Sequence, residues 1–325
     1  MIPVVQLGTI SYSDGLRVQQ KLVELRKTGA IGDVLLLLEH TPVITLGRNA
    51  KTANVLASTE ALAARGVEVF DCDRGGDVTF HGPGQIVGYP IFDLRGFSRE
   101  NSSQPSAVSH QEEPAARESL PAGRKTLGVV DYVRRLEEVL IRTCGDFGLA
   151  TKRVPGMTGV WTEPSQPDLD REGHDFTVCG KAPIRAGLGK GTSSTRANMA
   201  LPSDGALASE ARDEAKIAAI GVHISRSITS HGFALNVNAE LSYFSLIVPC
   251  GITSKPVTSM QKELRREVDS DAVAHSLSRN FGTVFGHQML WLESLDALMG
   301  QQVGVPMKPP EELRRLHNSD EDLLA

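Results

Sequence analysis

The amino-acid sequence predicts an α/β or α+β protein built around a β-sheet. Helical and strand-like segments alternate over residues 14–94, and a strongly amphipathic helix is expected at 129–149. Two further strand-like segments follow at 216–224 and 232–237. Because both periodicities recur along one chain, we expect helices packed against a sheet.

The first helix is expected from about Asp14 to Gly29, because apolar residues recur there at helical spacing and glycine is a common helix stop. The segment VLLLLEH (34–40) is a short continuous apolar run and is typical of a buried strand. The next residues, HTPVITLGRNA (40–50), are interpreted as a turn.

A second, short helix is expected after Ser58, whose hydroxyl suits a helix N-cap. It leads into the strand GVEVF (66–70), the glycine-rich loop RGGDVTFHGPGQ (74–85) and a strand at 86–94. Glycine tolerates positive φ and lets the backbone approach a ligand closely, but it also serves ordinary tight turns. The loop alone leaves both interpretations open.

The remaining elements come after residue 128. The helix at 129–149 ends near Gly148, and the strands at 216–224 and 232–237 are joined by a turn region between them. LSYFSLIVPCG (241–251) is an apolar run that opens into a loop. Helices are expected near 269–281 and 288–299.

We expect one domain over residues 1–300, interrupted by insertions at 97–126 and 163–215, and a polar C-terminal tail at 301–325. Both insertions are polar and lack apolar periodicity, as in mobile loops. The stretch GLGKGTSST in the second insertion lacks the spacing and the preceding strand of a phosphate-binding loop.

Composition excludes several classes of protein. A formal net charge of −5 argues against nucleic-acid binding, and no apolar run is long enough for a membrane span. No secretory signal or Arg-rich transit peptide is visible. The four cysteines form no CxxC pair, so neither a zinc site nor a disulfide framework is expected.

Cys250 is the sharpest candidate for a nucleophile. It stands between proline and glycine in IVPCGI, a pattern that suits an exposed elbow. A cysteine is more often a small packing residue, and the sequence leaves that alternative open. A thiol attacks efficiently only when enough of it is thiolate.

Lys216 is the second candidate, because it opens the otherwise apolar strand KIAAIGV. The alternative is a solvated lysine at a strand end. If its ammonium lay beside Cys250, two unit charges at ~4 Å with an effective dielectric of ~20 would attract by about 4 kcal/mol. A hundredfold gain in thiolate requires only about 2.7 kcal/mol, so one lysine would suffice.

His81 and His231 each precede a glycine at a junction between loop and strand. A lone histidine is more often structural, but these two make a shared pocket conceivable. Arg74 and Arg48 suit an anionic or amide group of a substrate, or surface ion pairs.

Four segments, taken in order, resemble the octanoyltransferase family. They are RGGDVTFHGPGQIVGYPIFDL, VPGMTGVW, KIAAIGVHI followed by HGFALNVN, and LSYFSLIVPCG. The resemblance covers nearly all of residues 1–300 apart from the insertions. It implies a mixed sheet with flanking helices, like the catalytic domain of biotin and lipoate protein ligases.

The resemblance also implies a reaction: transfer of an octanoyl group from octanoyl-acyl carrier protein to a lysine of lipoyl domains, through a cysteine thioester. Cys250 is then the nucleophile and Lys216 the group that activates it. Neither ATP, metal nor another cofactor is expected. The family often has tyrosine where this chain has Phe80. The implied acyl-binding residues, to which His231 is added, are Arg74, Gly75, Gly76, Asp77, Val78, Thr79, Phe80, His81, Ala219, Ile220, Gly221, Gly232, Phe233 and Ala234.

The acceptors implied are the lipoyl domains of 2-oxoacid dehydrogenase complexes and the glycine cleavage H protein. The protein is expected to be a monomer that binds neither nucleic acid nor membrane. The insertions resemble those of eukaryotic, particularly fungal, members, which implies a mitochondrial location. The rival readings are an ATP-dependent lipoate or biotin-type ligase of the same fold and a catalytically silent scaffold that binds lipoyl domains.

Overall fold

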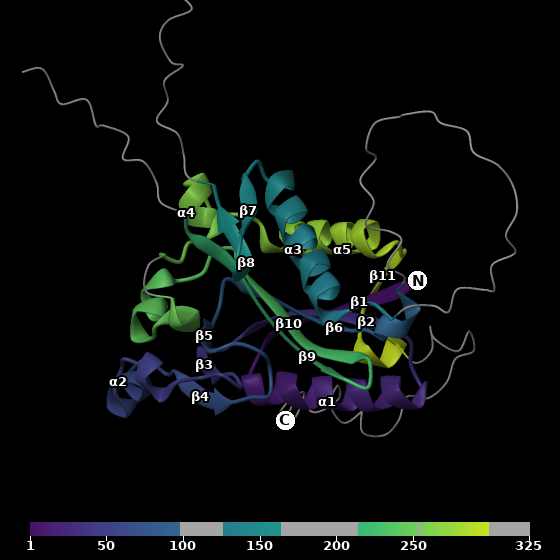
Figure 1. Cartoon of the computed structure of the whole chain (residues 1–325), viewed down its shortest axis with the longest axis horizontal. Coiled ribbons are helices and arrows are strands. Elements are labelled where there is room, and N and C mark those ends of the chain that lie inside the picture. The colour runs from purple at the N-terminus through teal and green to yellow at the C-terminus, as the bar shows by residue number, and fades with distance from the viewer. Residues whose placement is uncertain (98–125, 164–213, 253–254, 299–325) are drawn as a thin grey trace, which may run out of the picture. The chain divides into compact units, whose positions relative to one another are not determined.

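The computed structural model describes residues 1–97, 126–163, 214–252 and 255–298 (Figure 1). The helices are α1 (Tyr12–Thr28), α2 (Thr59–Ala64), α3 (Val129–Asp146), α4 (Met260–Leu264) and α5 (Ser270–Phe285), with short 3₁₀ turns η1 (Thr52–Asn54), η2 (Leu94–Gly96), η4 (Leu241–Leu246) and η5 (Pro249–Gly251). The strands are β1 (Ile2–Ile10), β2 (Val34–His40), β3 (Val43–Leu46), β4 (Glu68–Asp71), β5 (Val78–His81), β6 (Gln85–Ile91), β7 (Thr151–Val154), β8 (Met157–Thr162), β9 (Lys216–Ser225), β10 (Ile228–Asn236) and β11 (Met289–Leu292).

Eight strands form one mixed sheet in the order β11-β1-β2-β6-β10-β9-β8-β7. β1 runs parallel to both β11 and β2, whereas the other neighbours are antiparallel. The predicted mixed sheet with flanking helices is therefore confirmed. β2 is buried along almost its whole length, as its continuous apolar run predicts.

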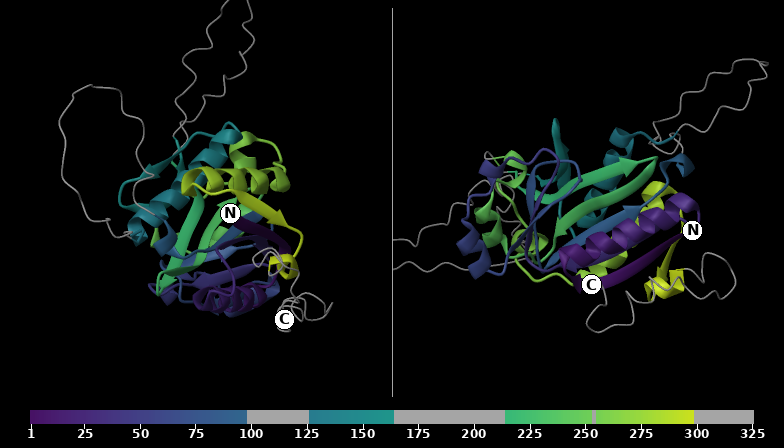
Figure 2. Two further views of the ribbon diagram at one scale, coloured as in Figure 1. Left: turned by 90° about the vertical axis from the view of Figure 1, so that its right-hand side faces the viewer. Right: turned by 90° about the horizontal axis from the view of Figure 1, so that it is seen from below.

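Helices cover both faces of this sheet (Figures 1 and 2). On one face Val18 and Leu22 of α1 pack against alternate residues of β2, β6 and β10. On the other face α3 and α5 enclose a second apolar cluster that includes Leu136 and Phe281. α1 begins at its N-cap Ser11 and ends at Gly29, whose positive φ closes the helix as predicted.

A separate three-stranded sheet, in the order β4-β3-β5, carries the glycine-rich loop. Its apolar side chains, including Ile44, Val78 and Phe80, form a third cluster that also receives η4. The Phe80 ring stacks on Tyr243 with centroids 4.7 Å apart. The small sheet thereby holds η4, and the cysteine turn η5 that follows, against the rest of the fold.

Several element predictions were wrong. β1 and β3 were not predicted, because neither has the strict alternation of a strand that is half exposed. β10 begins at Ile228 and not at 232: Arg226 and Ser227, both with positive φ, make a two-residue hairpin turn. Where a helix was expected from 288, the chain first adds β11 to the sheet.

The limits of both predicted insertions also need correction, because their flanking residues belong to the fold. Phe97 is buried against the α5 side of the sheet. Glu214 forms ion pairs with Lys152 and Lys255, and Ala215 exchanges hydrogen bonds with Thr162. The remainder of both insertions and the predicted tail lie outside the described residues. No described helix is long and apolar enough to cross a bilayer.

Candidate active site

The glycine-rich loop is fixed by close backbone approaches on two sides. On one side a side chain at Gly47 would collide with the Gly76 carbonyl, and on the other a Cβ at Gly221 would lie 2.8 Å from the Gly75 carbonyl oxygen. The Gly75 N–H donates to Val222 O at 3.1 Å. These glycines therefore let the small sheet and the β9–β10 hairpin meet across the loop, which a bulkier sequence would prevent.

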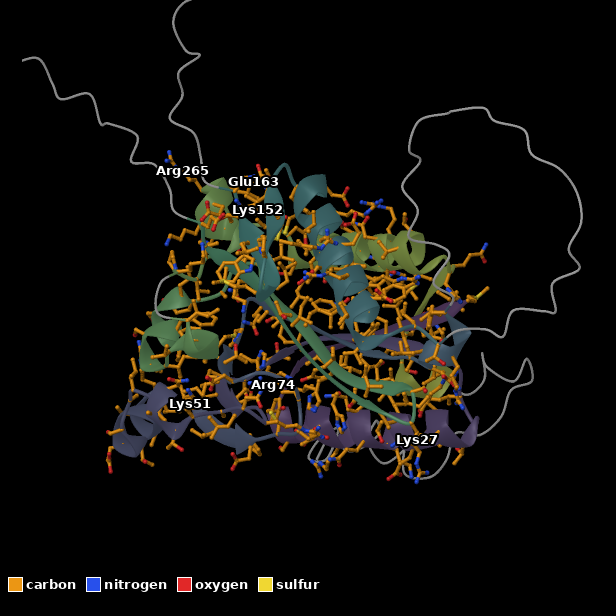
Figure 3. The ribbon with its side chains drawn as sticks, viewed as in Figure 1. Lys27, Lys51, Arg74, Lys152, Glu163 and Arg265 are labelled. Atoms are coloured by element: carbon orange, nitrogen blue, oxygen red, sulfur yellow. The ribbon has the colours of Figure 1, made fainter. Side chains whose placement is uncertain are left out.

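Beneath this loop lies a cavity that brings together most of the predicted acyl-binding residues. Arg74 lies among packed side chains here (Figure 3), its guanidinium donating to Thr45 O and Oγ1 at 2.6 and 2.8 Å. The predicted residues that line the cavity are Arg74, Gly75, Gly76, Thr79, His81, Ala219, Ile220, Gly221, His231, Gly232, Phe233, Ala234 and Cys250.

A second, smaller cavity adjoins the first at Cys250. The two share Thr79, Ala219, Ala234 and Cys250, and the second is also lined by Lys216 and by residues of η4 and η5. The thiol therefore lies where both cavities meet, with Lys216 on one side only.

Cys250 occupies a strained turn. Its φ of +55° is in the left-handed region that favours glycine. Val248 N–H donates to Asn54 O at 2.7 Å, and the following Gly251 has φ +68° and leaves a Cβ position only 3.0 Å from Asp77 Oδ2. The apolar run before it forms 3₁₀ turns, and not a strand. The turn holds the sulfur where the two cavities meet.

Lys216 is the first residue of β9 and is buried, with 7% of its surface exposed. Its Nζ lies 3.3 Å from Cys250 Sγ. The backbone is clamped on both sides, since Lys216 N–H donates to Pro256 O at 2.8 Å and Thr258 N–H donates to Lys216 O at 2.9 Å. The ammonium also lies 5.3 Å from the Trp161 ring centroid. Sequence could suggest this pairing, but only the fold brings positions 34 residues apart into contact.

Gly159 makes room for the lysine stem. Its φ is +120°, and a Cβ there would lie 2.8 Å from Lys216 Cε and 2.6 Å from Ala218 O.

Gly159→Ala is therefore expected to destabilise the fold by about 1–3 kcal/mol and to displace Lys216 from the thiol. Urea unfolding and the rate of Cys250 alkylation measure the two effects. Gly156→Ala is the matched control, because Gly156 also has positive φ but has open space around it. Equal alkylation rates in the two variants would contradict the proposed role of Gly159.

His81 lies in the interior, with only 8% of its surface exposed. Its Nδ1 is 2.6 Å from Gln85 Oε1, and Gln85 Nε2 donates to Asn236 Oδ1 at 2.8 Å. Asn236 Nδ2 in turn donates to Thr258 O at 2.9 Å. This buried chain of hydrogen bonds connects His81, which lines the larger cavity, to Thr258, which is hydrogen-bonded to the Lys216 backbone.

Burial lowers the pKa of His81 from 6.5 to about 3 and that of the neighbouring His40 from 6.5 to about 4. His40 Nε2 lies 2.6 Å from the hydroxyl of Tyr89, which also lines the larger cavity. Both imidazoles are therefore neutral at pH 7 in the folded protein.

In the unfolded chain both imidazoles have the ordinary histidine pKa of about 6.5, so they bind protons more readily than in the folded protein. The free energy of unfolding is therefore expected to fall as the pH drops from about 6.5 towards 4. The loss is about 1.4 kcal/mol per pH unit for each histidine. Urea unfolding of His40→Gln at pH 7 and pH 5.5 should show a correspondingly shallower loss. His275→Gln, an exposed change on α5, serves as control; the wild-type slope in His40→Gln would contradict the expectation.

His231 also lines the cavity, and the sequence did not reveal its partner. Its Nε2 lies 2.7 Å from Asp73 Oδ1, and the other Asp73 oxygen pairs with His223 Nδ1. Partial burial acts to raise the pKa of Asp73, but the two histidines outweigh it and lower that pKa. Burial lowers the pKa of His231. Arg48 contacts His223 Nε2 at 3.2 Å and does not line the cavity.

Three predicted acyl-binding residues do not line either cavity: Asp77, Val78 and Phe80. Val78 and Phe80 point into the small-sheet core, because alternate residues of a strand face opposite sides. Asp77 instead fixes the neighbouring chain, accepting from Asn54 Nδ2 at 2.6 Å and Lys51 N at 3.1 Å.

Other lining residues were missed, notably Tyr12, Val87 and Tyr89. Tyr12 belongs to α1 and the other two to β6; the Tyr12 ring lies parallel to the His81 ring, with centroids 6.4 Å apart. The alternation of β6 could have placed Val87 and Tyr89 on one face, but no local signal links Tyr12 to them. In the described part of the chain, no group of three His, Cys, Asp or Glu residues is arranged to hold a metal ion.

The fold and the cavity place the chain among lipoate-ligase-like catalytic domains. Residues 11–117 and 119–282 match the family described as lipoyl protein ligase A/B catalytic domain. The fold is similar to that of a bipartite lipoate protein ligase from Thermoplasma acidophilum, with a TM-score of 0.54 at 12% identity over 99% of this chain and 95% of that one. A lipoate-protein ligase A bound with ATP gives a TM-score of 0.53 at 12% identity, over 99% and 98%.

Sequence relatives define the family more narrowly. An octanoyltransferase of Koribacter versatilis is 48% identical over 320 residues, which is 98% of each chain. An octanoyltransferase of Acidobacterium capsulatum is 48% identical over 296 residues, 90% of this chain and 94% of that one. The chain belongs to the octanoyltransferase family, and it is an acyltransferase.

Proposed function

We propose that the protein transfers an octanoyl group from octanoyl-acyl carrier protein to a lysine of a lipoyl domain, through a thioester on Cys250. The observation that carries this proposal is the 3.3 Å contact between Lys216 Nζ and Cys250 Sγ at the junction of two cavities. A thiol next to a buried cation, at the end of a narrow cavity, suits acyl transfer through a covalent intermediate.

In the first half-reaction the Cys250 thiolate attacks the donor thioester carbonyl. A new S–C bond forms on Cys250, the donor C–S bond breaks, and the leaving thiolate takes a proton from the Lys216 ammonium. In the second, the amine of the acceptor lysine attacks the enzyme thioester. Its N–C bond forms, the Cys250 S–C bond breaks, and the neutral Lys216 amine takes the proton. The enzyme thus returns to its starting state.

The larger cavity receives the acyl chain. It begins at Cys250 and is walled by Val87, Ala219 and Ala234, whose small or aliphatic side chains suit methylene groups. The smaller cavity lies on the lysine side of the thiol and leaves room for the departing or the incoming group.

The donor thioester is already activated, so no nucleotide is needed. When octanoyl-carrier protein is mixed with the purified enzyme without ATP, the mass of the enzyme is expected to rise by about 126 Da, because an octanoyl group replaces the thiol hydrogen. Intact-mass spectrometry measures this adduct. A strict requirement for ATP would favour the ligase reading, and the absence of any adduct would favour the scaffold.

The acceptors that we propose are lipoyl domains of 2-oxoacid dehydrogenase complexes and the glycine cleavage H protein.

That the enzyme acts as a monomer and in mitochondria stays a prediction. The relatives named above are bacterial, and the Koribacter protein aligns over 320 residues, so a chain of this length also occurs in a bacterium. Fractionation of the source cells would test the location.

A further inference from the structure

The larger cavity follows the β9–β10 hairpin away from the thiol. Ala219 pairs with Ala234 near Cys250, and Val222 pairs with His231 three residues further along. At about 3.3 Å per residue this distance is roughly 10 Å. With C–C bonds of about 1.5 Å, an extended eight-carbon chain spans roughly 9 Å. An octanoyl group on Cys250 would therefore end beside His231.

His231 is held firmly in this position. Its φ of +55° interrupts the extended backbone of β10, and its N–H donates to Gln19 Oε1 of α1 at 2.6 Å. Its ring meets the Tyr89 ring nearly edge-on, with centroids 6.4 Å apart. A left-handed conformation in a residue other than glycine persists only where surrounding contacts enforce it.

Asp73 holds the same ring from outside. The Asp73 side chain is 52% exposed, whereas the His231 side chain is 4% exposed, so the pair spans from solvent to the cavity lining. The other Asp73 oxygen pairs with His223 on β9. The carboxylate thus ties the start of the glycine-rich loop to both strands of the hairpin at the end of the cavity remote from Cys250.

We propose that His231, positioned by Asp73, is the stop that limits the acyl chain to about eight carbons. This inference rests on the proposed function. Each additional buried methylene would improve binding about fourfold. Here a longer chain would instead have to push the imidazole from its carboxylate and leave buried polar groups without partners. His231 is the specificity-determining residue, and Asp73 acts through it.

The test measures how much of the full-length enzyme is acylated on Cys250 when it is mixed with carrier-protein thioesters of C8, C10, C12 or C14 acyl chains. Intact-mass spectrometry measures the acylated fraction for each chain length. Asp73→Ala is expected to raise the C12-to-C8 loading ratio about tenfold, and His231→Ala by up to about a hundredfold. Asp73→Asn, which keeps one acceptor oxygen, should give an intermediate ratio. Asp71→Asn, a change at an exposed carboxylate of β4, is the matched control and should keep the wild-type ratio.

Ratios within twofold of wild type in Asp73→Ala, with C8 loading retained, would overturn this inference alone. This variant alters an exposed side chain, so the test does not depend on whether His231→Ala folds. A wild-type enzyme that gains no adduct from any donor would overturn the proposed function, and the chain-length stop with it.

Discussion

Cys250→Ala is expected to abolish the acyl adduct and to lower octanoyl transfer at least about 10⁴-fold, because the nucleophile is lost and no other group takes its place. Among the described cysteines, Cys144 is buried in α3, and Cys72 donates its S–H to Leu46 O at 3.3 Å. Neither lines the two cavities. Intact mass and a transfer assay with a lipoyl-domain acceptor measure the effect.

Cys72→Ser is the control for this experiment, because it removes a half-buried thiol near the glycine-rich loop but outside both cavities. It should retain both the adduct and most of the transfer rate. An adduct that persists in Cys250→Ala, or that disappears in Cys72→Ser, would contradict the assignment of the nucleophile.

Lys216→Met is expected to slow both half-reactions by about 10²–10⁴-fold, the usual contribution of a positioned general acid or base. Methionine keeps an apolar stem beside Gly159 and Trp161 but removes the charge and the exchangeable proton. Alkylation of Cys250 by iodoacetamide at pH 7 should also slow, because the side chain that contacts Sγ at 3.3 Å would then carry no charge.

Lys255→Met is the matched control. Lys255 Nζ lies 5.8 Å from the same Trp161 ring, but it pairs with Glu214 and does not contact the thiol. This variant should change alkylation and acyl loading by less than about threefold. If Lys216→Met left the pH profile of alkylation unchanged, the lysine would not be the group that activates the thiol.

The cavity lining shows which of the predicted site residues the fold brings together and which it turns away. Ala219 and Ala234 were predicted to bind the acyl chain, and the hairpin register brings them opposite each other. Val78 and Phe80 came from the same motif as Thr79 and His81, but they turn into the small-sheet core. A sequence motif marks a segment, whereas the alternation of a strand decides which half of it faces a cavity.

Hydrogen-bond partners were the least predictable part of the site. Asp73 had no visible pairing pattern, yet it holds His223 and His231 from positions more than a hundred residues away in the chain. The Gln85–Asn236 hydrogen bond joins residues 151 positions apart. Such pairs have no local signature, because they depend on how two sheets and a hairpin meet.

Long motifs in order are a property of the chain alone, so the family, and through it the mixed sheet, could be predicted from the sequence, and Cys250 and Lys216 could be named as candidates. It also marked RGGDVTFHGPGQ as a glycine-rich segment, although Val78–His81 within it forms β5 and not loop. What the glycines of this segment do became clear only from the fold. They let two backbones approach closely, His81 is buried, and Asp73 fastens His231 at the end of the cavity. These contacts arise between elements distant in sequence, so no local pattern of residues could specify them.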